Sequence, residues 1–185
     1  INDNLRFNVS YNFSKLYNEV VYVGSTEGFL EGGSFMVGEN LRTSRMEAGH
    51  PIGYFYGYKT DGVYQNQAEI DALNFNAPVP TNGGTKVYHT NAKPGDLKFV
   101  DVNGDNTITV EDKTYLGDPI PDMTMGLTFG INYKNMDFSA SSFASLGNDL
   151  VRDYERKNLY SNKGSYVMDS WTTTNPSNTV PRHVN

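Results

Sequence analysis

The sequence contains no cysteine, which excludes disulfide bonds and thiolate metal sites as sources of stability. No segment of the chain reaches the roughly 18 consecutive apolar residues that a membrane-spanning helix requires. The histidines, His50, His89 and His183, lie far apart without ligand-like spacing. No glycine-rich phosphate loop or nucleophile motif is present. The sequence therefore gives no indication of an enzyme.

Positive charge is also scarce, because 15 lysines and arginines face 21 acidic residues and leave a net charge of -6. Such a chain offers no basic surface, which argues against a nucleic-acid partner. The hydrophobic fraction is only 37%, while glycine and tyrosine are frequent, a composition that favours strands and polar loops. The chain begins at Ile1 without an initiator methionine or a leader sequence, and we expect a segment of a larger protein.

A strict two-residue period marks the most regular parts of the chain. Over Leu5–Phe13 and again over Met123–Tyr133, apolar residues alternate with polar residues or glycine. This alternation predicts strands with one apolar face and one polar, solvent-facing face. The Lys134-Asn135 pair predicts a tight turn. A second strand then follows, in which Met136, Phe138 and Ala140 alternate with Asp137, Ser139 and Ser141. At about 3.4 Å per residue, these strands are long enough to cross a bilayer at the tilt usual in barrels.

The remaining segments have weaker patterns. Val20–Val23 is rich in strand-forming residues, Gly28–Gly33 interrupts that pattern, and Gly53–Tyr58 alternates aromatic residues with glycines. The aromatic run is compatible with a girdle at a membrane interface and with packing over bare backbone. Asn66, followed by Glu69, predicts the N-cap of a short helix over Gln67–Leu73.

The expected fold is therefore all-β: a segment of an antiparallel transmembrane β-barrel with one short loop helix. Strands are expected near 4–15, in pieces over 20–58, and at 122–134 and 136–147. Long loops are expected at 59–121 and 148–185, the second of them as an extended surface loop without a dependable period.

The residues from Asp101 to Asp112 have the spacing of an EF-hand calcium loop. Oxygen ligands would come from the side chains of Asp101, Asn103, Asp105 and Asp112 and from the carbonyl of Thr107. We expect Ca²⁺ to act here as a structural staple, without a part in any reaction.

Two departures from the calcium pattern leave an alternative open. Asn106 stands where the pattern has the glycine of the sharp turn, although asparagine tolerates a left-handed backbone better than most residues. Asp112 replaces the longer glutamate at the last position. The alternative is a turn in which Asp and Asn side chains bind their own backbone without a metal.

Several ordered motifs resemble one family. These are the stretches from Pro51 to Gln65, from Lys93 to Asp105 and from Leu116 to Pro121, followed by Tyr133–Ser139, Gly147–Asp149 and the stretch from Trp171 to Arg182. Together they resemble the SusC/RagA family of TonB-linked outer-membrane transporters, and the resemblance extends over almost the whole chain.

That resemblance implies a barrel of about 22 strands that is closed by an N-terminal plug. It further implies a SusD-like surface lipoprotein as partner, outer-membrane lipid around the barrel, and import of glycans or peptides with energy relayed by TonB. This chain would be a fragment of the C-terminal part of the barrel, with the TonB-contacting region outside it. In a Gram-negative outer membrane, the Lys134-Asn135 turn would be periplasmic, and loops 59–121 and 148–185 would be extracellular.

A soluble, calcium-stapled β-module, of the dockerin-like or carbohydrate-binding kind, is the competing hypothesis. A dockerin would carry a second calcium loop with helical flanks, whereas one copy occurs here. Tyr54, Tyr56, Tyr58 and Trp171 are able to stack on sugar, but loop packing accounts for them equally well. The sequence does not identify substrate-binding residues.

Overall fold

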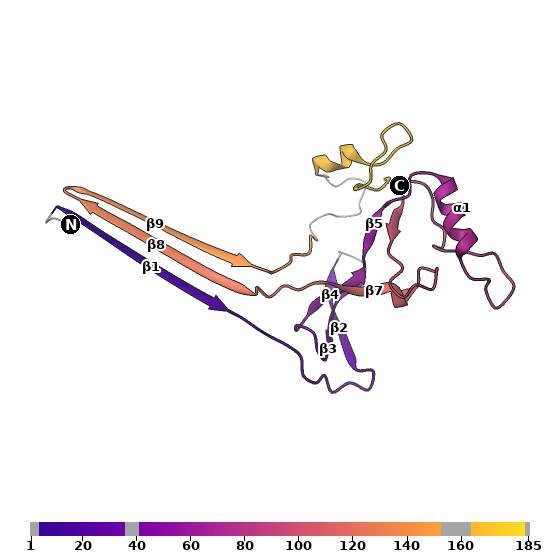
Figure 1. Cartoon of the computed structure of the whole chain (residues 1–185), viewed down its shortest axis with the longest axis horizontal. Coiled ribbons are helices and arrows are strands. Elements are labelled where there is room, and N and C mark those ends of the chain that lie inside the picture. The colour runs from indigo at the N-terminus through magenta and orange to yellow at the C-terminus, as the bar shows by residue number, and fades with distance from the viewer. Residues whose placement is uncertain (1–3, 36–40, 153–163, 184–185) are drawn as a thin grey trace. The chain divides into compact units, whose positions relative to one another are not determined.

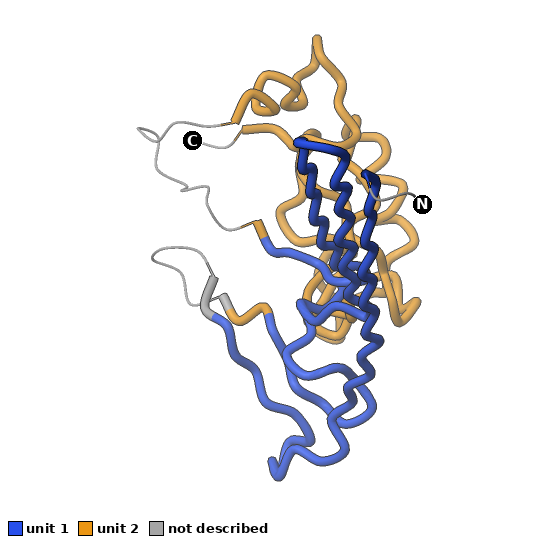
Figure 2. Tube along the Cα trace, turned by 90° about the vertical axis from the view of Figure 1, so that its left-hand side faces the viewer, with its two compact units in different colours: residues 1–33, 44–55, 117–151 blue, residues 34–43, 56–116, 152–185 orange. Residues whose placement is uncertain are grey.

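The structure is a computed structural model of the 185-residue chain. It describes residues 4–35, 41–152 and 164–183, with three sheets, one α-helix and two 3-10 helices (Figure 1). The chain divides into two compact units. Unit 1 comprises residues 1–33, 44–55 and 117–151, and unit 2 comprises residues 34–43, 56–116 and 152–185 (Figure 2).

A sheet of three long antiparallel strands dominates unit 1. It contains β1 (Leu5–Lys15), β8 (Met123–Tyr133) and β9 (Met136–Leu146), each of 11 residues, in the order β1-β8-β9. Pairing of β1 with β8 runs without a bulge from Leu5 opposite Tyr133 to Lys15 opposite Met123. The three strands lie side by side in Figure 1. The strands predicted at 4–15, 122–134 and 136–147 are confirmed to within one or two residues.

The predicted turn at Lys134-Asn135 is also confirmed. It connects β8 directly to β9, and Lys134 adopts a positive φ of 52°, as tight hairpin turns require. Among the described residues, the outer edges of β1 and β9 pair with no further strand, and the sheet is open. A closed barrel is therefore not formed by the part of the chain that the structure describes.

The second sheet differs from the expected arrangement. Its order is β2 (Phe29–Phe35), β3 (Leu41–Glu47), β4 (Tyr54–Tyr58) and β7 (Lys113–Gly117). The strand expected at Val20–Val23 is absent, and the glycine-rich stretch that we expected to interrupt pairing instead falls largely within β2.

At the start of the stretch Val20–Val23, both backbone groups of Val20 bind a turn that is distant in sequence. The Val20 N–H donates to the His50 carbonyl at 2.9 Å, and the Gly49 N–H donates to the Val20 carbonyl at 2.9 Å. This pair of bonds holds Val20 against a turn, where no strand continues alongside it. Tyr54 at the start of β4 is 2% exposed and donates from its hydroxyl to Glu47 at 3.0 Å. For this tyrosine the packing interpretation of the aromatic run is correct.

The range 59–121, predicted as a loop, contains much of the secondary structure of unit 2. β5 (Thr60–Val63) pairs with β6 (Leu97–Phe99), and α1 (Gln67–Asn76) lies between them in the sequence. The predicted N-cap is confirmed, because the Asn66 side chain accepts the Glu69 N–H at 2.9 Å. The helix continues three residues beyond the predicted end. Two 3-10 helices follow, η1 (Val110–Asp112) and η2 (Ser165–Asp169).

A small core holds unit 2 together. The residues that are less than a tenth exposed there include Val63, Tyr64, Ile70, Ala77 and Tyr88. Burial raises the pKa of the Tyr64 hydroxyl to about 12 and lowers the pKa of the neighbouring His89. At the surface of this core, Lys98 of β6 forms ion pairs with Asp61 at 3.2 Å and Glu69 at 3.4 Å.

Within the described ranges, the helices are too short or too polar to cross a membrane.

Candidate functional site

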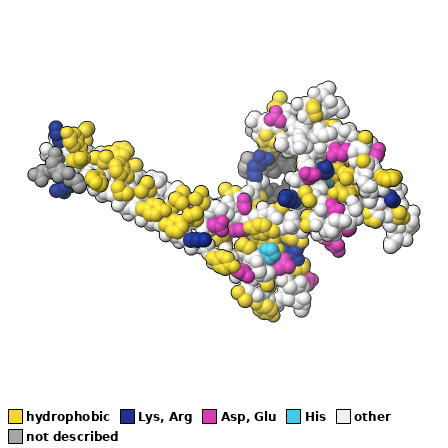
Figure 3. Space-filling model, viewed as in Figure 1, with side chains coloured by type: hydrophobic (Ala, Val, Ile, Leu, Met, Phe, Trp, Pro, Cys, Tyr) yellow, Lys and Arg dark blue, Asp and Glu magenta, His cyan; other side chains and the backbone are white. Residues whose placement is uncertain are grey.

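The three-stranded sheet has one apolar face that is open to its surroundings. Directly paired residues share a face of an antiparallel sheet, and the pairs on this face include Phe7 with Ile131 and Val9 with Phe129. The exposed fractions of the β1 side chains on this face are 56% for Phe7, 59% for Val9, 61% for Tyr11 and 52% for Phe13. Hydrophobic side chains follow the sheet in Figure 3. An unburied apolar surface of this length marks a lipid or protein contact.

The opposite face is polar and carries two close contacts between asparagine and glycine. A Cβ atom on Gly130 would lie 2.3 Å from Oδ1 of Asn8, and one on Gly126 would lie 2.9 Å from Oδ1 of Asn12. The two asparagine side chains therefore lie over the glycine backbone of β8, and a larger residue at either glycine would require the asparagine to move. On the same face Thr128 and Ser141 share a hydrogen bond of 3.2 Å. This surface is suited to contact with water or with other polar groups.

Phe143 is an exception that the sequence analysis missed. It pairs with Gly126 on the polar face, and its side chain is 75% exposed. The alternation that we followed from Met136 ends at Ser141, yet β9 continues to Leu146 because its backbone pairing with β8 is unbroken. The sequence shows a bulky residue at 143 and a glycine at 126. Only the register of β8 and β9 reveals that these two residues are paired.

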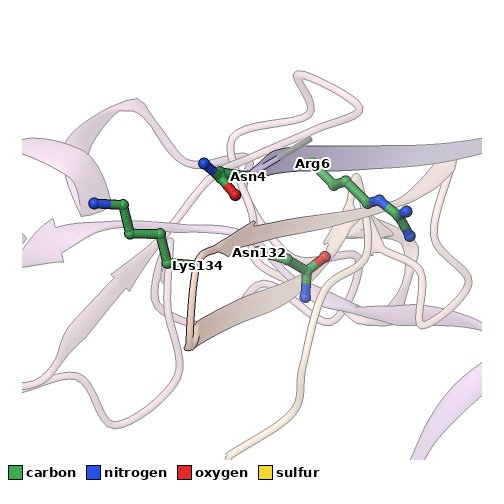
Figure 4. Close-up of a pocket in the computed structure, with 4 residues that line it drawn as sticks. All are labelled: Asn4, Arg6, Asn132 and Lys134. Carbon is green, nitrogen blue, oxygen red and sulfur yellow. The ribbon is translucent and has the colours of Figure 1, made fainter. Parts of the chain in front are cut away.

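At the turn end of the sheet a polar hollow of about 360 Å³ is lined by Asn4, Arg6, Asn132 and Lys134. Arg6 and Asn132 occupy paired positions in β1 and β8. Figure 4 shows Lys134 extending away from the Arg6 and Asn132 side chains. The Asn132 amide also donates to the carboxylate of Asp137 across the hairpin. The hollow therefore combines two cations with two amides.

In the predicted calcium loop, side-chain oxygens bind the backbone of the same loop. Oδ1 of Asp101 accepts the Gly104 N–H at 2.7 Å, and Oδ2 accepts the Asn106 N–H at 2.8 Å. Oδ1 of Asn103 accepts the Asp105 N–H at 3.0 Å, and Oδ1 of Asp105 accepts from Thr107 at 2.8 Å. Asn106 adopts a φ of 61°, as expected for the residue that replaces glycine. The loop conformation is thus stabilised by a series of Asx turns.

Asp112 is placed differently from the other predicted ligands. Its side chain is fully buried, with Oδ1 accepting the Val102 N–H at 2.9 Å and Oδ2 accepting the Thr109 N–H at 2.7 Å. Burial acts to raise the pKa of this carboxyl, but the hydrogen bonds from Thr109 and Val102 outweigh it, so the pKa lies below its usual value. A carboxylate in this position ties together the two ends of the loop.

The structure therefore brings Asp101, Asn103 and Asp105 into one exposed turn and turns Asp112 inward. Among the residues that the structure describes, no three acidic or histidine side chains gather in the manner of a metal site. The other predicted ligands, the Asn103 side chain and the Thr107 carbonyl, are uncharged oxygens of the same turn. The hydrogen-bond pattern is that of the alternative interpretation, an Asx-rich turn, and calcium binding stays a prediction.

A second feature missed in the sequence is the attachment of the segment after η2 to the core of unit 2. Nε1 of Trp171 donates to the side-chain oxygen of Gln65 at 3.1 Å, and the Arg182 N–H donates to the Gly95 carbonyl at 2.7 Å. Nε of Arg182 is also 2.7 Å from Oδ1 of Asp96. The described part of the predicted surface loop at 148–185 is therefore anchored at several points.

The chain was compared with known proteins, and no family model matches it. It is 30% identical over 187 residues to the TonB-dependent receptor P3 of Formosa agariphila, an alignment that covers 98% of the chain and 17% of that receptor. TonB-dependent receptor P26 of the same organism is 30% identical over 97% of the chain and 17% of its own length. TonB-dependent receptor SusC of Bacteroides thetaiotaomicron is 30% identical over 91% of the chain and 15% of its own length.

The chain thus spans only about a sixth of the length of the curated relatives that it matches. Within that span the similarity extends over both units described above. The chain is homologous, over nearly its whole length, to TonB-dependent receptors, among them SusC.

Proposed function

We propose that this chain forms part of the wall and the outer loops of a TonB-dependent importer in the outer membrane of a Gram-negative bacterium. The cargo of the complete receptor would be glycans or peptides, and a SusD-like surface lipoprotein would be its partner. The TonB complex would act through a region outside this chain. The observation that carries the proposal is the three-stranded sheet, with its long apolar face exposed and its other face polar.

Physical reasons favour lipid as the surroundings of the apolar face. A soluble module buries such a face in its core, yet Val9 is 59% exposed and Leu127 is 44% exposed. In a bilayer, exposed apolar side chains are favourable, but unpaired backbone is costly unless neighbouring strands close the sheet. The unpaired outer edges of β1 and β9 are the places where such neighbours would join. The competing hypothesis of a soluble module explains neither the face nor the edges.

Loop length gives the orientation that we propose. Transmembrane barrels have short turns on the periplasmic side and long connections outside. The two-residue turn at Lys134-Asn135 would therefore be periplasmic, and the folded segment 59–121 and the segment 148–185 would be extracellular. The polar hollow around Arg6 and Lys134 would then lie at the periplasmic end, inside the barrel wall.

Site-directed labelling tests this arrangement, and this chain contributes no cysteine of its own to the background reaction. In the intact receptor in its native membrane, Val9→Cys and Phe129→Cys should resist a charged maleimide and react with a lipid-soluble one. The matched variants Ser10→Cys and Thr128→Cys, which pair with each other on the polar face, should show the opposite preference where water reaches the wall. Equal reaction of both pairs with the charged reagent would contradict the proposal.

Transport requires a separate measurement. Cells that carry the intact receptor should accumulate a fluorescently labelled oligosaccharide or peptide cargo, and a matched strain lacking TonB should not. Uptake that persists at the same rate without TonB would rule out the proposed energy source. This test applies to the complete receptor, because the chain covers only a small fraction of its relatives.

We also propose that the Asp101–Asp112 loop binds Ca²⁺ as a structural staple. Support comes from the spacing of its oxygen groups and from the left-handed Asn106, which gives the tight turn that such loops need. Asp101, Asn103, Asp105 and the Thr107 carbonyl would be ligands from the exposed turn. Asp112 would join them only if its carboxylate exchanged backbone donors for the metal.

Calcium titration of the purified chain in detergent micelles, followed by calorimetry, provides the test. Saturable heat is expected for the wild type, together with a melting temperature that falls on addition of chelator. Asp101→Ala and Asp105→Ala should abolish both effects, whereas Glu111→Gln, at an exposed position in the same loop, should preserve them. An identical melting temperature of the wild type with calcium and with chelator would show that the loop is not stabilised by Ca²⁺.

A further inference from the structure

Unit 2 contains a second hollow, of about 320 Å³, which is lined by Trp171, two prolines and polar residues without charge. The polar residues include the amides Gln65, Asn66 and Gln67 and the hydroxyl residue Thr173. The volume is at the lower end of the range of about 300 to 1,000 Å³ that is common for small-molecule sites. The lining differs from that of the hollow at the hairpin, where Arg6 and Lys134 contribute charge.

The indole of Trp171 is held in a defined orientation. Its Nε1 donates to Oε1 of Gln65 at 3.1 Å, and the Gln65 amide nitrogen donates in turn to the Val63 carbonyl at 2.7 Å and the Ser177 carbonyl at 3.0 Å. The benzo edge packs on Gly95, where a Cβ atom would lie 2.4 Å from Cε3 of the indole. The aromatic ring is therefore ordered before any ligand arrives, which reduces the entropy that binding would cost.

Polar groups beside the ring have capacity for a ligand. The Asn66 side chain caps α1 through its oxygen alone, and the Gln67 amide nitrogen donates to Asp71 at 2.9 Å, which leaves its carbonyl oxygen as an acceptor. Amides supply both donors and acceptors, so they match hydroxyl groups, which also do both. The residues that line the hollow include no charged side chain, so the hollow offers no ion pair to a charged ligand.

From this combination we propose that the hollow is a binding site for one ring of a neutral saccharide. The apolar face of the sugar would stack on the Trp171 indole, and its hydroxyl groups would bond to the amides of Asn66 and Gln67. The biological meaning of such a site, as a point of cargo capture, rests on the proposed function, whereas binding itself does not depend on transport.

Trp171 is the single tryptophan of the chain, so emission excited selectively at tryptophan, and not at the tyrosines, comes from this site. The full chain in detergent micelles is titrated with neutral tetra- to hexasaccharides of glucose, mannose, galactose or xylose. We expect a saturable change in tryptophan emission with at least one of these, and none with an oligogalacturonate of equal length. If no neutral oligosaccharide alters the emission up to 10 mM, roughly the limit of a weak site, the proposal is overturned.

Variants then separate binding from folding, with affinity measured by calorimetry. Trp171→Ala should weaken binding about tenfold or more, while Trp171→Phe, which keeps an aromatic ring, should retain most of it. The double variant Asn66→Ser and Gln67→Ala keeps a helix cap and leaves Trp171 in place, and it should also lose binding at least tenfold. This variant decides the matter if Trp171→Ala does not fold. Phe75→Ala removes another aromatic of unit 2, one that is 78% exposed and outside the hollow, and should change nothing.

The two proposals fail in different ways. Undiminished affinity in the double variant would overturn the saccharide site and leave the importer unaffected. Saccharide binding by a receptor whose apolar strand residues react with charged maleimide would instead support the site and contradict the membrane importer.

Discussion

Asp112 offers the most direct test of how the loop from Asp101 to Asp112 is held. We consider Asp112→Asn, which preserves the size of the side chain but replaces one accepting oxygen with an NH₂ group. In the structure both oxygens accept backbone N–H groups, from Val102 at 2.9 Å and from Thr109 at 2.7 Å, at full burial. The variant keeps one acceptor and sets a donor against a donor at the other position. Loss of one hydrogen bond to a charged group costs about 1.5 to 3 kcal/mol.

Amide hydrogen exchange, followed by mass spectrometry on peptides that cover the loop, measures this cost locally. At 1.4 kcal/mol per factor of ten, the Val102 and Thr109 amides should exchange about 10 to 150 times faster in the variant than in the wild type. Excess chelator is present, so that a bound metal makes no contribution. The exposed neighbour Glu111 supplies the control, because Glu111→Gln should leave exchange unchanged. Wild-type protection in Asp112→Asn would show that the buried carboxylate does not hold the loop.

The same amides should respond to pH in a defined direction. The folded-state pKa of the Asp112 carboxyl lies below its usual value, so the ionised form is favoured by folding. Its stabilisation is therefore complete above the ordinary pKa of about 4 and is lost as the pH falls through the lower folded-state value. Protection factors, corrected for intrinsic exchange, should be constant between about pH 5 and 7 and decline only below pH 4. A decline that begins near neutral pH would assign the effect to another group.

Three further outcomes are expected. In the assembled receptor, Leu127→Lys should lower the free energy of unfolding by about 2 to 4 kcal/mol if the residue lies near the bilayer midplane. Thr128→Lys, on the other face, should lower it much less. Unfolding in urea measures both variants. Gly95→Ala should lower stability by about 1 to 3 kcal/mol, since its φ is +90° and a Cβ would lie 2.4 Å from the Trp171 indole. Asn66→Ala should cost about 1 kcal/mol through the lost helix cap, seen as reduced ellipticity at 222 nm.

The long strands were predictable because their signal is repeated many times. In β1 and β8 each successive residue confirms which face is apolar, and the two-residue turn at Lys134-Asn135 leaves only one register for β9. The strand β2 was not predictable in this way. Its glycines have little strand preference of their own, and they are paired because β3 lies alongside. Val20–Val23 shows the converse, since favourable residues do not form a strand without a neighbour.

The same distinction applies to the candidate sites. The spacing of Asp101, Asn103 and Asp105 is local, and it correctly indicated a tight turn with a left-handed Asn106. The inward direction of Asp112 depends on where the Val102 backbone lies, which spacing does not reveal. Trp171 and Gln65 are 106 positions apart, and no periodicity connects them. Contacts of this kind arise from the fold of unit 2 as a whole.

The unpaired borders of β1 and β9 have a consequence for biogenesis. If the proposed barrel forms, β1 and β9 would present unpaired main-chain donors and acceptors along 11 residues each, together with an apolar surface, until neighbouring strands join them. Such a ribbon recruits further copies of itself as readily as its proper neighbours. During passage through an aqueous compartment it would need a holding chaperone, and a preparation of this piece without detergent should precipitate as β-rich aggregates.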